Sequence, residues 1–124
     1  MSSRILMVDD EAPTRELYSL YFQTRGIQVE TASSPAEALQ KLAAEPFDLV
    51  LLDLRLGNSD GLDLIKPIKA VRPQVPVLAF TGKAFDDATR RRAAELGACG
   101  VVGKAEPLDY LVRMIQKNIT LSGQ

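Results

Sequence analysis

Residues 5–11 read ILMVDDE, a short apolar run that ends in three acidic residues. Two later stretches have the same form, because residues 49–53 read LVLLD and residues 77–81 read VLAFT. Short apolar runs bounded by polar residues are typical of buried strands in a parallel sheet. Ligands bind such sheets beyond the carboxyl ends of the strands. If these three strands are neighbours, we expect the polar residues at their ends to form one functional site.

The rest of the chain alternates strand-like and helix-like segments from end to end. Polar and apolar residues alternate over residues 27–32, which indicates a strand with one wetter face, as at the edge of a sheet. A short fifth strand is expected around residues 100–102. Five β–α units with right-handed crossovers predict one α/β domain over residues 1–124, with an open, doubly wound parallel sheet. The strand order that fits is 2-1-3-4-5, which brings strands 1, 3 and 4 together at the centre.

Capping and breaking signals predict five helices. The first is expected to bury an apolar stripe made of Leu17, Leu20 and Tyr21. Pro67 lies inside the third helix and is expected to kink or shorten it. The helices are expected to begin near Pro13, after Pro35, after Gly61, near Asp86 and at Pro107.

The composition excludes several classes of protein. The 15 basic and 16 acidic residues give a net charge of −1, which argues against direct nucleic-acid binding. No apolar stretch approaches a membrane span, and the start of the chain leaves no room for a signal peptide, so we expect a cytoplasmic protein. The chain has no histidine, which excludes histidine-based acid–base catalysis and histidine metal ligands. The single cysteine, Cys99, cannot form an intrachain disulfide and is expected to be a small buried residue.

Asp9, Asp10 and Asp53 are expected to lie together at the ends of adjacent strands. At an effective dielectric constant of about 20, two carboxylates about 4 Å apart repel each other by roughly 4 kcal/mol. A bound cation relieves such repulsion, and two carboxylates plus waters form the usual arrangement around Mg²⁺. We therefore predict a Mg²⁺ site. The alternative is that Asp10 caps the first helix and that Asp53 begins a turn.

A lysine and a hydroxyl are expected at the same edge of the sheet. Lys104 follows the fifth strand and can reach back over the strand ends, while Thr81 ends the fourth strand. A metal ion, an ammonium group and a hydroxyl around a carboxylate form a cradle for a phosphoryl group, with Asp53 as the nucleophile that forms an acyl phosphate. Taken singly, Lys104 is better explained as a solvated surface lysine, and Thr81 is explained equally well as a residue that satisfies the backbone at a strand end.

The motifs of this chain resemble those of the receiver domain of bacterial two-component response regulators, the CheY-like family. The resemblance covers essentially the whole chain and rests on residues 5–11, 51–54, 60–62, 80–82 and Lys104. It implies a flavodoxin-like fold in which Asp53 accepts a phosphoryl group from the phosphohistidine of a sensor histidine kinase or a phosphotransfer protein. Because only a few residues follow the last predicted helix, we expect either a stand-alone regulator or part of a longer one.

The resemblance also implies roles for individual site residues. Mg²⁺ would be held by Asp10, Asp53 and the backbone carbonyl of Arg55, with Asp9 acting through water. Thr81 and Lys104 would move towards the phosphoryl group. This movement would rearrange the face formed by helix 4, strand 5 and helix 5, which would then bind an output domain, a partner protein or a second copy of the chain.

Several positions depart from the family pattern. Ala105 stands where the family usually has a proline preceded by a cis peptide, so the loop is either trans and reshaped or strained. Val101 stands where the family has a switch aromatic, and Leu56-Gly57 replaces the common Met-Pro. Arg55 and Lys83, two residues beyond Asp53 and Thr81, are expected to border the site, and we hypothesise that they shield the acyl phosphate from water; otherwise they are solvated side chains.

Three alternatives remain beside a phosphorylated signalling module. One is a receiver-like interaction module whose phosphorylation switch is weakened or absent, which the residues at positions 101 and 105 suggest. Another is an aspartyl phosphatase of the haloacid-dehalogenase type, but the position of its general acid is occupied by Arg55. The third is a flavodoxin-type cofactor binder, which would need a hydroxyl-rich phosphate loop where this chain has Asp9-Asp10-Glu11.

Overall fold

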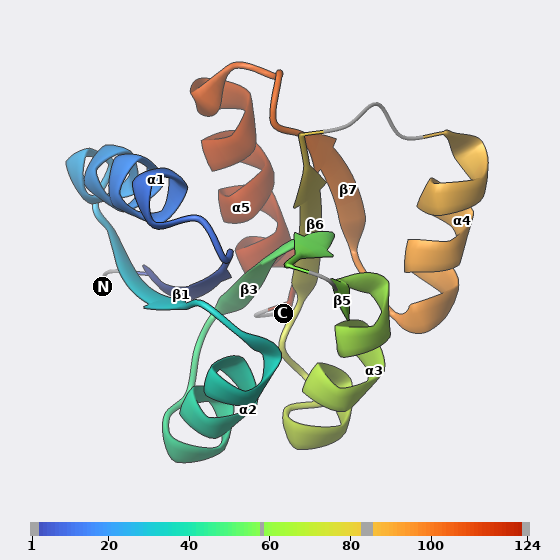
Figure 1. Ribbon diagram of the computed structural model, residues 1–124. Helices are drawn as coiled ribbons and strands as arrows, with labels where there is room; N and C mark the ends of the chain where they lie inside the picture. The colour runs from blue at the N-terminus through green and yellow to red at the C-terminus, as the bar shows by residue number, and fades with distance from the viewer. Residues whose placement is uncertain (1–2, 58, 83–85, 123–124) are drawn as a thin grey trace.

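Within the residues that the structure describes, 3–57, 59–82 and 86–122, five parallel strands form one sheet (Figure 1). The structure is a computed structural model. The strands are β1 (Ser3–Val8), β2 (Ile27–Ala32), β3 (Leu49–Asp53), β6 (Val77–Thr81) and β7 (Gly100–Gly103). Their order is β2-β1-β3-β6-β7. This order confirms the predicted order 2-1-3-4-5, because β6 and β7 are the fourth and fifth strands of the sheet.

Helices cover both faces of the sheet (Figure 1). They are α1 (Ala12–Thr24) and α5 (Leu108–Ser122) on one face, and α2 (Pro35–Ala44), α3 (Leu62–Val71) and α4 (Asp87–Leu96) on the other. Alternate residues of one strand point to opposite faces, so Leu6 packs in the cluster with α2 and α3, while Met7 packs in the cluster with α1 and α5. Both side chains are fully buried, which is why the central strands are continuously apolar.

The helix boundaries follow the local signals of the sequence. Ser34 caps α2 by accepting a hydrogen bond from the Glu37 N–H at 3.2 Å, and Gly97 ends α4 with a φ of +112°. Pro67 does not end α3, because the helix continues to Val71. Among the described residues, no helix is both long and apolar enough to cross a membrane.

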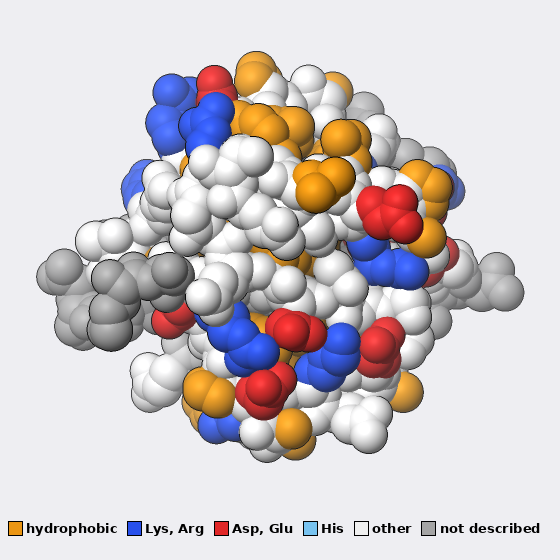
Figure 2. Space-filling model, turned by 90° about the vertical axis from the view of Figure 1, so that its left-hand side faces the viewer, with side chains coloured by type: hydrophobic (Ala, Val, Ile, Leu, Met, Phe, Trp, Pro, Cys, Tyr) orange, Lys and Arg blue, Asp and Glu red, His pale blue; other side chains and the backbone are white. Residues whose placement is uncertain are grey.

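The buried side of α1 differs from the predicted one. Tyr18 and Phe22 are buried, whereas Leu17 is 58% exposed and Leu20 is 64% exposed. The two aromatic side chains lie one helical turn apart, and the Tyr18 ring lies 5.7 Å from the ring of Phe80 on β6. Packing these larger rings turns the two leucines outward, so the prediction was wrong for both. Figure 2 shows hydrophobic side chains gathered over α1, above a region of interleaved acidic and basic groups.

Cys99 is exposed, so the prediction that it is buried was also wrong. It lies in the connection between α4 and β7, where the chain runs along the surface. Its backbone N–H donates a hydrogen bond to the carbonyl oxygen of Val77 at 2.8 Å. The backbone at this position is therefore fixed to the sheet edge, while the residue itself stays accessible.

A small hairpin, which we did not predict, follows β3. It consists of β4 (Arg55–Leu56) and β5 (Ser59–Asp60), which pair antiparallel. The hairpin returns the chain to β3, so that the Gly61 N–H donates to the carbonyl oxygen of Leu54 at 2.9 Å. A Cβ at position 61 would lie 2.3 Å from the carbonyl oxygen of Asp53 and 2.6 Å from the Cα of Leu54. Only glycine permits this close approach of two backbones.

We expect Gly61→Ala to destabilise the protein by about 1 to 3 kcal/mol, because the backbone around Asp53 must move to make room for the methyl group. Gly100→Ala is the matched control, since its Cβ would meet the Cδ1 of Leu78 at an acceptable 3.4 Å. Urea unfolding of the two variants measures the difference. Equal free energies of unfolding would show that the close approach at Gly61 is not a constraint.

Candidate functional site

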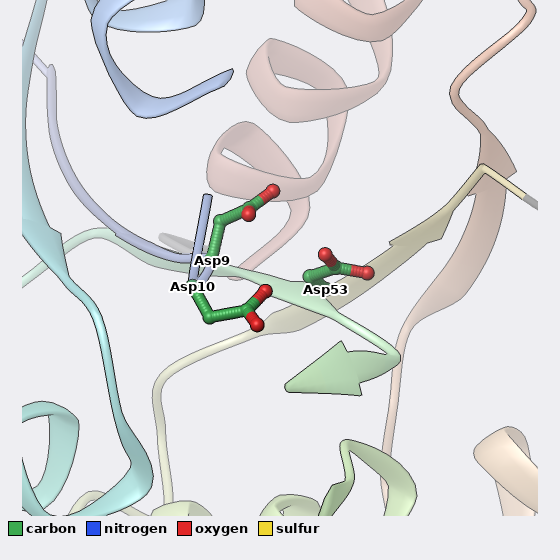
Figure 3. Close-up of side chains that lie close together, drawn as sticks. All are labelled: Asp9, Asp10 and Asp53. Atoms are coloured by element: carbon green, nitrogen blue, oxygen red, sulfur yellow. The ribbon is translucent and has the colours of Figure 1, made fainter. Parts of the chain in front are cut away.

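Three carboxylates converge beyond the carboxyl ends of β1 and β3 (Figure 3). Asp9 and Asp10 directly follow β1, and Asp53 is the last residue of β3. The two strands are adjacent, and each of the three residues offers a carboxylate oxygen within 4.8 Å of the others. Asp9 and Asp53 are buried, whereas Asp10 is exposed. The structure therefore brings together the three carboxylates that the sequence assigned to one site.

Each of these carboxylates accepts a hydrogen bond from one backbone N–H. The donors and their acceptors are Glu11 N–H to Asp9 Oδ1 at 2.8 Å, Arg55 N–H to Asp53 Oδ1 at 3.0 Å, and Gly57 N–H to Asp10 Oδ2 at 2.8 Å. The alternative role for Asp10, as the cap of the first helix, is wrong. The N-cap position of α1 is Glu11, which makes no side-chain capping bond.

Lys104 joins the two buried carboxylates. Its Nζ lies 3.1 Å from Asp9 Oδ2 and 3.0 Å from Asp53 Oδ2, and 4.8 Å from the centre of the Phe80 ring. Lys104 is therefore not a solvated surface lysine. Its single positive charge binds two of the three carboxylates that lie together here, so the three carboxylates and Lys104 together carry an excess of negative charge.

Burial raises the pKa of Asp53 above the ordinary value of an aspartate, and the negative charge of Asp9 raises it further. The Arg55 N–H and the ammonium of Lys104 act in the opposite direction without cancelling the effect of burial. Burial by itself would lower the pKa of Lys104. Hydrogen bonds and charges from Asp53 and Asp9 outweigh it and raise that pKa. The lysine thus stays protonated at neutral pH.

Thr81, the last residue of β6, is buried. It lies one residue beyond Phe80, which pairs with Asp53 across the sheet, and its carbonyl oxygen accepts the N–H of Lys104 at 2.7 Å. Arg55 is exposed and lines the pocket above the carboxylates, whereas Lys83 falls outside the described residues. The structure therefore places Thr81 and Arg55 around Asp53.

An open pocket of about 800 Å³ lies over the carboxylates. One side of it is formed by Asp53, Lys104 and Gly82, and the other by Pro13, Leu17 and Tyr18 of α1. We did not predict Tyr18 as a site residue, because the apolar stripe of α1 was assigned to the wrong side. The spacing of Tyr18 and Phe22, one turn apart, was the signal that could have identified it.

The loop after β7 has the trans form, which is one of the two forms expected from the sequence. No cis peptide occurs among the described residues, so the bond between Lys104 and Ala105 is trans. Val101 is buried in the cluster that includes α4. It carries no ring that could change position.

Parallel strands flanked by helices, together with an acidic pocket at their carboxyl ends, define a class of α/β proteins that bind ligands at this edge. A sequence model of the family described as "Response regulator receiver domain" matches residues 5–116. The chain belongs to this family, the receiver domains of two-component signal transduction.

Individual relatives agree with this assignment. The response regulator protein PilR of Pseudomonas aeruginosa is 35% identical over 118 residues, which are 95% of this chain and 26% of PilR. A CheY-like receiver domain protein from Methanospirillum hungatei matches with a TM-score of 0.91 and 25% identity, over 99% of this chain and 98% of that one. A response regulator from Burkholderia pseudomallei, whose crystal structure contains a phosphorylated aspartic acid, a calcium ion and citrate, has a TM-score of 0.86 and 30% identity, over 96% and 69% of the two chains. The chain thus spans about a quarter of PilR.

We expect Asp53→Asn to raise the melting temperature of the metal-free protein at pH 7 by about 2 to 5 °C. Because the pKa of Asp53 is raised in the folded state, the folded protein binds the proton of this carboxyl more tightly than the unfolded chain does. The resulting contribution to the free energy of unfolding is complete below the unfolded pKa of about 4, and it is lost as the pH rises through the folded pKa. At neutral pH the ionised Asp53 adds to the repulsion from Asp9, and asparagine removes that charge.

Thermal unfolding in a chelating buffer, followed by circular dichroism from pH 4 to pH 8, measures this effect. The advantage of Asp53→Asn should shrink as the pH falls towards 4. Asp63→Asn, at an exposed position of α3, is the matched control and should give no such gain. A melting temperature for Asp53→Asn at or below that of the unmodified protein at pH 7 contradicts the electrostatic account.

Proposed function

We propose that residues 1–124 form a single receiver domain that accepts a phosphoryl group on Asp53 in a Mg²⁺-dependent reaction. One observation carries this proposal: Lys104 reaches across the sheet edge to both Asp53 and Asp9, 3.0 and 3.1 Å away, inside a pocket with a third carboxylate. The arrangement combines a nucleophile, an ammonium group and an acidic metal-binding pocket. It catalyses the phosphorylation and dephosphorylation of Asp53 itself and turns over no separate substrate.

The donor set of the pocket fits Mg²⁺. All three candidate side chains offer carboxylate oxygens, and a hard cation that keeps several waters needs only one or two of them. We assign Asp10, Asp53 and the backbone carbonyl of Arg55 as the ligands, with Asp9 acting through a water molecule. When bound, the ion supplies positive charge for the oxygens of the phosphoryl group.

The chemical step is an in-line displacement at phosphorus. A carboxylate oxygen of Asp53 forms the new P–O bond as the P–N bond of a phosphohistidine breaks, and the electron pair of that bond stays on the imidazole nitrogen. The ammonium of Lys104 exchanges its contact with Asp53 for a contact with a phosphoryl oxygen. Thr81 donates a hydrogen bond from its hydroxyl to a second phosphoryl oxygen.

We propose a sensor histidine kinase or a phosphotransfer protein as the donor, working in the cytoplasm. These 124 residues contain no histidine, so the phosphohistidine lies outside them. A donor that covers the pocket also covers the exposed side of α1, where Leu17 forms part of the pocket wall. An apolar contact there is compatible with a protein partner.

For the output, we propose that α4, β7 and α5 form the face that binds an output domain, a partner protein or a second copy of the chain. The net charge of −1 gives no reason to propose direct binding to nucleic acid. A second candidate function is an interaction module that works without phosphorylation. Val101, which offers no aromatic ring to signal the state of the site, favours this second candidate.

We expect incubation with acetyl phosphate and Mg²⁺ to add the mass of one phosphoryl group to the protein, and to add none to Asp53→Asn. A chelator should abolish the gain in the unmodified protein. Intact-protein mass spectrometry measures the product. If the unmodified protein gains no mass, the interaction module becomes the better account.

We expect Lys104→Met to slow the formation of the acyl phosphate by roughly 10² to 10³, the usual effect of removing one group that stabilises a developing charge. Lys117→Met is the matched control, because Lys117 is exposed on α5, away from the pocket. Time courses with acetyl phosphate compare the two variants. Equal rates of acyl phosphate formation in the two variants would show that Lys104 does not take part in the reaction.

We expect Arg55→Ala to shorten the half-life of the acyl phosphate several-fold, because the exposed Arg55 side chain at the pocket then no longer hinders the approach of water. Arg91→Ala, an exposed arginine of α4, serves as the control. The decay is followed by mass spectrometry after removal of the donor. An unchanged half-life would show that Arg55 does not shield the acyl phosphate.

A further inference from the structure

The loop after β3 makes a direct contact with the acidic pocket through Gly57. The Gly57 N–H donates a hydrogen bond of 2.8 Å to Asp10 Oδ2, joining residues 47 positions apart in the sequence. Gly57 has a φ of +57°, in the left-handed region that favours glycine. A proline at this position could not make the contact, because proline has no N–H and its φ is fixed near −65°.

The orientation of the Asp10 carboxylate depends on its backbone N–H bond more than the orientations of Asp9 and Asp53 depend on their own backbone N–H bonds. Asp9 and Asp53 are buried, and each is also bound by Lys104. Asp10 is exposed, and from the described residues its side chain receives only the bond from Gly57. Without it, the carboxylate is free to sample several rotamers in water, and holding it in one of them on binding an ion costs entropy.

We propose that Gly57 is a positioning residue for the divalent cation: its N–H fixes the Asp10 carboxylate in the pocket before the ion binds. This inference rests on the proposed function, because it assumes that the pocket binds Mg²⁺. One oxygen of Asp10 is engaged by the loop, while Oδ1 receives no bond from the described residues. Groups that orient metal ligands in this way typically contribute 10- to 100-fold to metal affinity.

The same contact holds the loop as well as the carboxylate. Gly57 directly follows β4, which begins at Arg55, and the Arg55 N–H is itself bound to Asp53 Oδ1. Two backbone N–H groups of one short segment thus bind two different carboxylates of the pocket. The Leu56-Gly57 sequence therefore supplies a backbone donor at a position where Met-Pro would have none.

Two substitutions separate the N–H from the other properties of the loop. Gly57→Pro removes the donor and excludes the left-handed backbone. Gly57→Asn keeps the donor, and asparagine tolerates a left-handed backbone better than other residues with a side chain. A Cβ at position 57 also has room, because its nearest neighbour would be Asp10 Oδ2 at 3.7 Å.

Isothermal titration of the full chain with MgCl₂ tests the proposal without using phosphorylation as a readout. We expect Gly57→Pro to bind Mg²⁺ about 10- to 100-fold more weakly than the unmodified protein, and Gly57→Asn to bind within about 3-fold of it. Equal affinity in Gly57→Pro overturns the inference. A loss in Gly57→Asn as large as that in Gly57→Pro also overturns it, because the asparagine variant keeps the N–H.

A second measurement on the unmodified protein keeps the inference testable even if Gly57→Pro does not fold. Amide hydrogen exchange by NMR in metal-free buffer should show protection of the Gly57 N–H, although the residue is exposed. Exchange at the rate of an unprotected amide overturns the inference. If the unmodified protein binds no Mg²⁺ at all, the proposed function is wrong. If the unmodified protein and Gly57→Pro bind Mg²⁺ equally well, only the inference about Gly57 is wrong.

Discussion

Three carboxylates lie together at the edge of the sheet while one ammonium group, that of Lys104, binds two of them, and this imbalance of charge is the main constraint on the site. Their repulsion has to be resisted by the scaffold, because Lys104 neutralises only one of the three charges. The scaffold consists of Ile5–Val8 of β1 and of β3, whose side chains are buried on both faces, and of a backbone N–H bound to each carboxylate. The stability of the sheet thus holds together a group of charges that would separate in a looser structure.

The sheet and the site were predictable from the sequence for the same reason. A strand buried on both faces must be apolar along its length, so the first polar residue, as at Asp9 or Asp53, marks both the end of the strand and the edge where ligands bind. The hairpin of β4 and β5 was not predictable, because two-residue strands have no periodicity. The buried side of α1 was assigned wrongly because its leucines and its aromatic residues form two competing apolar stripes, and only the packing of Tyr18 against Phe80 decides between them.

The position of Lys104 links the pocket to one particular face of the molecule. Its ammonium lies over the ring of Phe80, and that ring packs against Tyr18 of α1. The proposed movement of Lys104 towards a phosphoryl group would therefore change a contact in the cluster formed with α1 and α5. Val101 lies in the other cluster, with α4, and offers no ring to move. In the proposed function, the state of Asp53 would therefore reach α5, which is part of the proposed output face, through Lys104 and the cluster that contains Phe80.

A phosphoryl group adds further negative charge to a pocket that already holds more carboxylates than cations. At an effective dielectric constant of about 20, each charge of the phosphoryl group about 4 Å from Asp9 or Asp10 would be opposed by roughly 4 kcal/mol, and one lysine would not offset this for both carboxylates. In the proposed reaction, a divalent cation and the phosphoryl group would therefore stabilise each other in the pocket. By linkage, the factor by which the phosphoryl group strengthens cation binding equals the factor by which the cation favours the phosphorylated form. A contact to Asp10 can strengthen cation binding more in the phosphorylated protein than in the free protein. By the same linkage, such a contact would also favour phosphorylation of Asp53.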